Sequence, residues 1–183
     1  MKRAAVALIG VAIAIPEPYG SDLQRERGRF GDPLAGAIPT HVTLLPPTEV
    51  DTGDLPKAEL HLEDIAAGLT PFEMHLLGTD TFRPVSPVVF VRVARGAEDC
   101  EQIEGAVRSG PLNREVVFGY HPHVTIAHHL PDETLDRACD ELATYDACFA
   151  VASFSLYRHG SDGVWRPDRT FAFGRGTSQA QPS

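Results

Sequence analysis

The stretch His41-Val42-Thr43-Leu44 decides the fold, because it returns almost unchanged as His123-Val124-Thr125-Ile126. In an extended strand, residues two apart point to the same face. Each copy therefore presents an imidazole beside a hydroxyl on one surface of a strand. The two copies lie less than half of the 183-residue chain apart. One structural unit used twice would fit in this length.

The surroundings of the two motifs repeat as well. Each motif is preceded by an apolar strand and a helix, and is followed by an amphipathic helix and an alternating strand. The first half predicts a strand over 4–11, helices over 21–31 and 55–69, and a strand over 72–76; the second predicts a strand over 88–93, helices over 97–108 and 133–144, and a strand over 149–156. This period is too long for a solenoid. It predicts two pseudo-symmetric lobes from an internal repeat of about 4–86 and 87–174.

An aromatic-Arg-Pro sequence recurs at one place in the repeat. Phe82-Arg83-Pro84 precedes the apolar run of the second half, and Trp165-Arg166-Pro167 precedes the last run, 170–173. Proline in both copies is typical of a turn.

On these residues the chain resembles the 2H phosphoesterase superfamily, in particular its bacterial 2'-5' RNA ligase and cyclic phosphodiesterase branch. The resemblance rests on the two His-x-Thr motifs, extends to the segment 72–93, and covers about residues 4–174. It implies a bilobal, pseudo-two-fold α+β fold in which antiparallel sheets line a central cleft, with helices outside and one motif strand on each wall. We expect one such domain over residues 1–176. The small and polar residues 177–183 predict a disordered tail.

Composition narrows the choice of partners. A hydrophobic content of 43% and a charged content of 22% are typical of a soluble globular protein. The net charge of −9 argues against a surface that follows duplex nucleic acid, which is held mainly by Lys and Arg. A small phosphorylated ligand or an RNA end is therefore the expected partner, with no membrane, and we expect a monomer.

The N-terminus and the cysteines indicate the compartment. Met1-Lys2-Arg3 and the apolar run after it have the pattern of a signal peptide, but the repeat makes that run a central strand. The three cysteines show no metal-type spacing, and their odd number fits a reducing compartment. We therefore expect a cytoplasmic protein.

The motif residues suit phosphodiester chemistry. An imidazole has an unperturbed pKa of about 6.5, so both protonation forms are accessible near neutrality. His41 and His123 can serve as acid and base, while Thr43 and Thr125 donate hydrogen bonds to phosphate oxygens. The resemblance implies hydrolysis of a 2',3'-cyclic phosphate to a 2'-phosphate, without a cofactor or metal. Which histidine is the base stays open, although the family's behaviour favours His123 in hydrolysis.

Two alternatives to hydrolysis remain. In the reverse reaction, the same groups would use an RNA 5'-hydroxyl as the nucleophile and make a 2'-5' bond. An RNA-end binding module that has the cleft without turnover is the other alternative, although binding alone does not need paired proton carriers.

The histidines around the second motif raise the question of a metal site. His121, His123 and His129 share one face of the motif strand if that strand is regular. Residues six apart on a strand lie about 20 Å apart, too far for one zinc ion, so we expect no metal. His128 stands where similar family members often have Arg, which puts an inherited phosphate contact there in doubt. It can equally be an exposed residue at the end of a strand.

The candidate substrate-binding residues follow from the repeat and the resemblance. The aromatic-Arg pairs either pack hairpins, or stack a nucleobase and contact a phosphate. Tyr120, just before the second motif, is a weaker candidate. The set comprises Phe82, Arg83, Tyr120, His128, Trp165 and Arg166.

Overall fold

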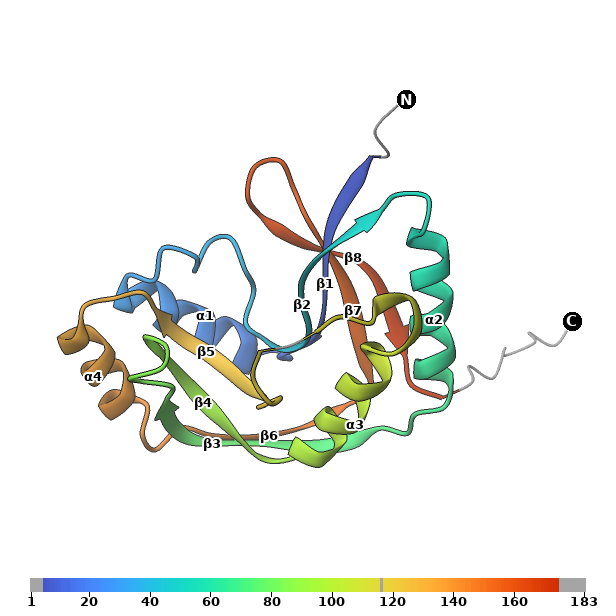
Figure 1. The fold of residues 1–183 in the computed structure, drawn as a ribbon. Helices are drawn as coiled ribbons and strands as arrows, with labels where there is room; N and C mark the ends of the chain where they lie inside the picture. The colour runs from blue at the N-terminus through green and yellow to red at the C-terminus, as the bar shows by residue number, and fades with distance from the viewer. Residues whose placement is uncertain (1–4, 116, 175–183) are drawn as a thin grey trace, which may run out of the picture.

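A computed structural model describes residues 5–115 and 117–174, and Figure 1 follows the chain through them. The elements are, in chain order, β1 (Val6–Ala14), α1 (Tyr19–Phe30), β2 (His41–Asp51), α2 (Leu55–Ala67), β3 (Phe72–Thr81), β4 (Val88–Arg95), α3 (Ala97–Val107), a 3-10 turn (Gly110–Leu112), β5 (His123–His128), α4 (Asp132–Glu141), β6 (Asp146–Val151), β7 (Ser153–His159) and β8 (Trp165–Ala172). The expected order of strand, helix and motif strand is present in both halves.

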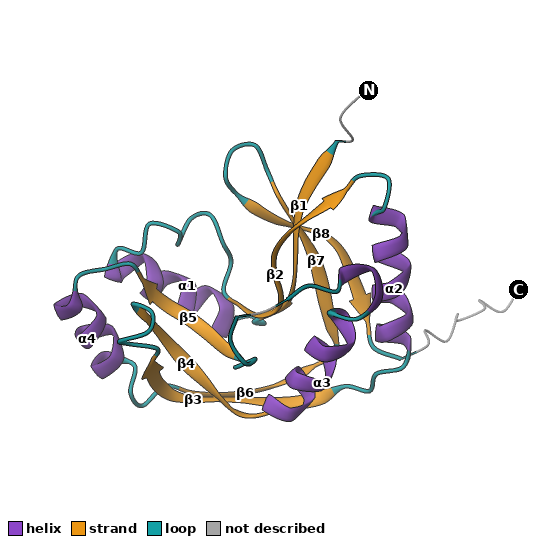
Figure 2. Cartoon of the chain, in the orientation of Figure 1, coloured by secondary structure: helices purple, strands orange, loops and turns teal. Residues whose placement is uncertain are grey.

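The strands form two antiparallel sheets. The first sheet has the order β2-β1-β7-β8, and the second has the order β5-β4-β3-β6. Each motif strand, β2 or β5, is thus an edge strand that pairs with the strand opening its half. Figure 2 shows the helices outside the two sheets and the edges β2 and β5 turned toward each other. The expected α+β class with two antiparallel sheets is confirmed.

Two of the helices pack against the sheet to which their flanking strands do not belong. α1 connects two strands of the first sheet but packs against β5 of the second, and α3 connects two strands of the second sheet but packs against β2 of the first. α2 packs against β8 and α3, while α4 packs against β3 and β4. The apolar stripes make this possible, since Leu62 of α2 and Leu135 of α4 are fully buried.

The strand expected over 149–156 is wrong as a single element. β6 ends at Val151 and belongs to the second sheet, whereas β7 begins at Ser153 and belongs to the first. The chain crosses between the sheets at Ala152, whose side chain is exposed. Apolar and polar residues can keep alternating through such a crossing. The alternation indicates which side chains are buried, but it does not indicate which strand is the hydrogen-bonding partner.

The two sheets do not coincide with the two halves of the sequence. The expected repeat boundary between residues 86 and 87 falls in the turn between β3 and β4, which pair with each other. The second sheet uses only residues 72–151, and the first sheet uses both ends of the described chain. The single domain over 1–176 and the repeat stay predictions, and the tail 177–183 lies outside the described residues.

Among the described residues, no helix is both long and apolar enough to cross a membrane.

Candidate active site

The two motif strands alternate between core and cavity. Val42 and Val124 are fully buried, and each lies between a half-buried histidine and a half-buried threonine. The apolar residue therefore anchors each strand in the core, while its neighbours His41 and Thr43, or His123 and Thr125, face open space. The same local sequence builds both walls.

A bulge follows each motif at the same place. In the first sheet Ala12 pairs with Thr43 and Val11 with Leu45, so Leu44 is an extra residue; in the second sheet Phe90 pairs with Thr125 and Val89 with Ala127, so Ile126 is extra. An extra residue shifts the alternation of faces by one position. His128 consequently lines the same cavity as His123 and Thr125.

The bulge overturns the expected face of one of three histidines, since His121 and His123 line the same cavity and His129 does not. The expectation grouped His121, His123 and His129 on one side of a regular strand. His129 instead follows the strand with a φ of 53°, and its ring stacks on that of His128 with 3.7 Å between centroids. Within the described residues, no group of three or more His, Cys, Asp or Glu side chains is placed to hold a metal ion.

Both motif imidazoles are held by the same backbone contact. The carbonyl of Pro39 accepts a hydrogen bond from Nδ1 of His41 at 2.6 Å, and the carbonyl of His121 accepts one from Nδ1 of His123 at 2.7 Å. A carbonyl can only accept, so Nδ1 carries the proton and Nε2 is the atom left for a proton transfer. Nε2 of His41 lies 3.1 Å from the hydroxyl of Thr43.

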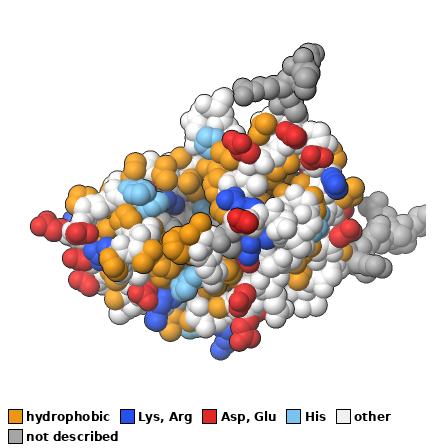
Figure 3. All heavy atoms as spheres, viewed as in Figure 1, with side chains coloured by type: hydrophobic (Ala, Val, Ile, Leu, Met, Phe, Trp, Pro, Cys, Tyr) orange, Lys and Arg blue, Asp and Glu red, His pale blue; other side chains and the backbone are white. Residues whose placement is uncertain are grey.

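Two cavities meet at the first motif. The larger, of about 600 Å³, is lined by Thr43, His123, Thr125 and the candidates Phe82, Tyr120 and His128. The smaller, of about 110 Å³, is lined by His41, Thr43 and Trp165. Thr43 therefore belongs to both cavities. On the face drawn in Figure 3, hydrophobic side chains cover much of the left half, histidines lie at several separate places, and Lys and Arg form small groups rather than a continuous track.

Burial keeps both imidazoles neutral in the free protein. Desolvation is the main cause that lowers the pKa of His123 to about 4, the charges of His121 and His41 lower it further, and the bond to the His121 carbonyl opposes them. Desolvation also lowers the pKa of His41, opposed by the bond to Pro39 and assisted by the charge of Arg27. The charge of His41 thus acts on His123, so the two motif histidines lie within electrostatic reach of each other.

Arg27 is a residue that sequence reasoning missed. It lies on α1 with only 3% of its surface exposed, and its Nε donates to Oδ2 of the fully buried Asp32 carboxylate at 2.8 Å. Its charge acts on both His41 and His128. The sequence does not reveal this buried pair, because Arg27 is one of three alternating arginines, Arg25, Arg27 and Arg29, and nothing local distinguishes it from the other two.

The two aromatic candidates occupy different surroundings. Phe82 packs on Phe90 at 4.3 Å and meets the ring of His123 edge-on at 4.9 Å between centroids. Trp165 lies in the wall of the smaller cavity, beside His159 at 5.0 Å between centroids. Phe82 thus supports a motif imidazole, while Trp165 faces open space next to the other one.

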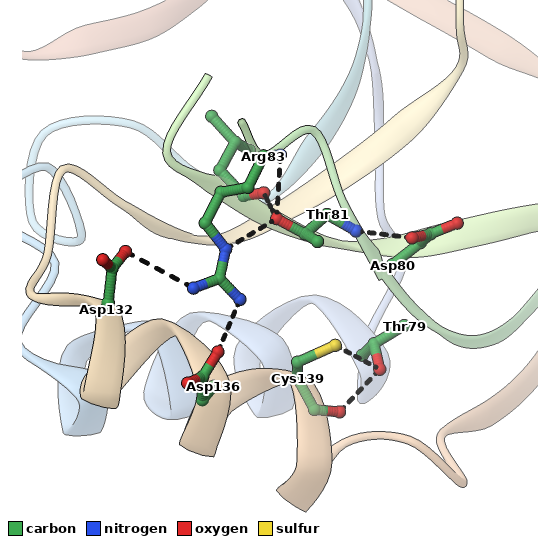
Figure 4. Close-up of polar contacts among 8 residues, drawn as sticks. Thr79, Asp80, Thr81, Arg83, Asp132, Asp136 and Cys139 are labelled. Atoms are coloured by element: carbon green, nitrogen blue, oxygen red, sulfur yellow. Dashed lines mark hydrogen bonds and ion pairs between the residues drawn. The ribbon is translucent and has the colours of Figure 1, made fainter. Parts of the chain in front are cut away.

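The two arginine candidates make ion pairs with carboxylates. Arg83 donates to Asp136 at 2.7 Å and to Asp132 at 3.4 Å, both on α4, and also to the hydroxyl of Thr81 (Figure 4). Arg166 makes a two-pronged pair with Asp162 in its own turn, at 2.7 and 3.0 Å. These contacts favour the hairpin-packing interpretation of both arginines.

Tyr120 connects the two walls. Its hydroxyl donates to the carbonyl of Thr43 at 2.9 Å, so the segment leading into β5 is tied to β2. Burial is the largest of the causes that raise the pKa of Tyr120, which keeps the hydroxyl protonated and able to donate.

Comparison with known proteins assigns the chain to a family. The sequence model of the 2'-5' RNA ligase superfamily matches residues 15–163, which include both motifs, and the chain belongs to this superfamily. A protein of Halalkalibacterium halodurans is 29% identical over 168 residues, covering 91% of this chain and 97% of its own length. One of Bacillus licheniformis is 26% identical over 164 residues, covering 88% and 96%. Both carry a provisional name as a phosphoesterase.

Solved structures share the fold. LigT of E. coli, crystallised with 3'-AMP, matches with a TM-score of 0.68 over 93% of this chain and 100% of that one, at 17% sequence identity. A Thermus thermophilus protein matches with a TM-score of 0.60 over 92% and 99%, at 22% identity. The two-sheet arrangement is thus the fold of these 2H-type proteins.

Proposed function

We propose that this protein is a phosphoesterase that opens 2',3'-cyclic phosphates of nucleotides or RNA ends to 2'-phosphates by two-histidine acid-base catalysis, without a metal ion. The observation that carries this proposal is the doubled imidazole geometry. Nδ1–H of each motif histidine donates a hydrogen bond to a carbonyl two residues earlier, so Nε2 of each ring is left for the reaction. Two equivalent proton carriers within electrostatic reach suit a reaction with one proton removed and one delivered.

The proposed hydrolysis exchanges one phosphorus–oxygen bond for another. A water molecule attacks phosphorus while one imidazole takes its proton, and the bond from phosphorus to the 3' oxygen breaks as the other imidazole, entering protonated, gives that oxygen a proton. One bond to oxygen forms and one breaks, and no electron transfer occurs. Thr43 and Thr125 would donate to the non-bridging oxygens, whose charge grows in the transition state.

The ligand classes of similar proteins support this substrate choice. LigT was crystallised with 3'-AMP, NADP+, ATP and phosphate. We infer that the larger cavity, with Tyr120 and His128 in its lining, receives part of a nucleotide here. The described cysteines, Cys100, Cys139 and Cys148, are free thiols, which fits our proposal that the protein works in the cytoplasm.

The test is incubation with the four nucleoside 2',3'-cyclic monophosphates and with an oligoribonucleotide that ends in a cyclic phosphate. The expected product carries its phosphate on the 2' oxygen alone, because a fixed acid protonates only the oxygen it faces. A mixture of 2'- and 3'-phosphates contradicts the mechanism. A 2'-5' bond formed when a 5'-hydroxyl RNA is added would favour the ligase direction. Tight binding of the RNA end without turnover would favour the binding module.

A further inference from the structure

The pseudo-symmetry of the two walls is broken beside the motifs. Ala12 lies opposite Thr43 in the first sheet, whereas Phe90 lies opposite Thr125 in the second. Two residues earlier on the same strands, Gly10 stands where the other wall has Val88. At the position opposite the motif threonine, Ala12 therefore leaves space beside His41, whereas the Phe90 ring fills the equivalent position beside His123.

On the His123 side the protein's own rings occupy this space. Phe90 and Phe82 lie 5.2 and 4.9 Å from the ring of His123, measured between centroids. The counterpart beside His41 is the smaller cavity, of about 110 Å³, which we call the indole slot. It is lined by Gly10, Val11, Ala12, Ile38, Pro39, His41, Thr43, Leu45, Pro47, Tyr157 and Trp165.

The indole of Trp165 is a fixed wall of the slot. A Cβ atom at Gly10 would lie 3.5 Å from the Trp165 ring and 3.3 Å from the Leu45 carbonyl oxygen, so the absence of a side chain lets the ring lie against β1. The Trp165 backbone N–H donates to the Ala37 carbonyl at 2.8 Å. The ring thus lies against β1, and the backbone that carries it is tied to the segment before β2.

We propose that the indole slot is a nucleobase subsite, so that the base of the bound nucleotide lies on the His41 side of the phosphate. Its lining residues are apolar apart from Tyr157 and from the motif end, where His41 and Thr43 stand. A nucleobase is a flat, neutral heteroaromatic ring, and it fits such walls when it stacks on the indole. The phosphate of the same nucleotide then reaches Thr43. The volume suits one ring system, because pockets for whole ligands measure about 300–1,000 Å³. The inference rests on the proposed function and adds the side on which the base binds.

Binding can be tested without turnover. Trp165 is the sole tryptophan, so its fluorescence reports on the slot directly. Adenosine 2'-monophosphate should quench it, whereas inorganic phosphate, which lacks a base, should bind without quenching. Ala12→Leu, which fills the slot, should weaken nucleotide binding by about 5- to 140-fold, the range for one stacked base, and leave phosphate affinity unchanged.

A pair of variants covers the case in which Ala12→Leu does not fold. Trp165→Phe keeps a flat ring and should retain nucleotide affinity within a few fold, whereas Trp165→Ala should lose it in the range above, measured by calorimetry. Equal affinity in both variants overturns the subsite. A loss on Phe118→Ala, in the lining of the larger cavity, with none on Trp165→Ala, also overturns it by placing the base there.

The experiments distinguish a failure of the proposed function from a failure of the nucleobase subsite. If cyclic phosphates are not opened but the nucleotide quenches Trp165 and Ala12→Leu prevents this, the proposed function fails and the subsite stands. If cyclic phosphates are opened at the same kcat/KM by the wild type and by Ala12→Leu, the function stands and the subsite fails.

Discussion

His41 and His123 each receive their orientation from a carbonyl two residues earlier, so replacing either ring removes a positioned proton carrier. We expect His41→Ala and His123→Ala each to lower kcat by about 10²–10⁴, the usual effect of a general acid or base. The double variant should lose far less than the product of the two, because the rings act as a unit. Steady-state rates on a cyclic nucleotide measure both.

His75 supplies the matched control for these variants. It is also a strand histidine, but it pairs with Asp146 at 2.8 Å and is outside both cavity linings. His75→Ala should keep wild-type turnover. Full activity in either motif variant would contradict the two-histidine mechanism.

The pH optimum follows from the burial of the same two rings. The reacting form needs one neutral and one protonated imidazole, and burial lowers the pKa of His41 and brings that of His123 to about 4. Most free protein at pH 7 therefore has both rings neutral. We expect kcat/KM to rise as the pH falls below 7 and to decline again once both rings are protonated.

This acid-side optimum differs from one centred near neutrality, which an unperturbed imidazole would give. An anionic ligand favours the protonated ring, so nucleotide binding at pH 7 should also take up a proton. Calorimetry in buffers of different ionisation enthalpy detects that uptake. A kcat/KM that climbs steadily into alkali would indicate hydroxide attack instead.

At the scale of elements, Arg83 joins the β3–β4 turn to α4. Arg83→Ala removes its bonds to Asp132 and Asp136, which are largely exposed carboxylates. Such pairs contribute about 0–1 kcal/mol each, so we expect the free energy of unfolding to fall by about 1 kcal/mol. Turnover should stay within a few fold of wild type, as chemical denaturation and rate measurements would show. A large rise in KM with unchanged stability would restore the phosphate-contact interpretation.

The sequence predicts the elements better than their partners. The repeated His-Val-Thr and the apolar stripes were enough to place β2, β5 and the helices that follow them, since these patterns are local. The crossing at Ala152 and the bulges at Leu44 and Ile126 depend on which strand lies alongside. Such pairing is tertiary information that one sequence does not display. For the same reason, the sequence gives His128 as a candidate without showing which side of the strand it faces.

At the scale of the whole molecule, the Tyr120 hydroxyl ties the segment before β5 to the Thr43 carbonyl on β2. Tyr120→Phe should lower the free energy of unfolding by about 0.5–1.5 kcal/mol, the net value of one hydrogen bond. It should also lower kcat, because both motifs must keep their relative positions.

Tyr145→Phe is the matched control. Among the described residues, the Tyr145 hydroxyl is buried without a hydrogen-bond partner, so its removal should cost no stability. Thermal denaturation of both variants makes the comparison. Equal effects would show that the Tyr120 bond does not hold the walls together.

Metal dependence is also a property of the whole site. Two imidazoles and two hydroxyls supply proton transfer and orientation, so a Lewis acid has no step left to assist. Dialysis against a chelator should leave kcat unchanged. Recovery of lost activity on adding zinc would contradict this expectation.

The sheet order also determines when the protein can become active during synthesis. The second sheet uses one continuous segment, whereas β1 of the first sheet must pair with β7, so that Ile9 lies beside Arg158. Pairings between such distant residues form late, because the long loop must first be closed. A nascent chain can complete the wall that carries His123 while β1 still lacks its neighbour in the other wall. We therefore expect the wall that carries His41 to be completed only after β7 has been synthesised, so a partly made chain would lack the assembled site.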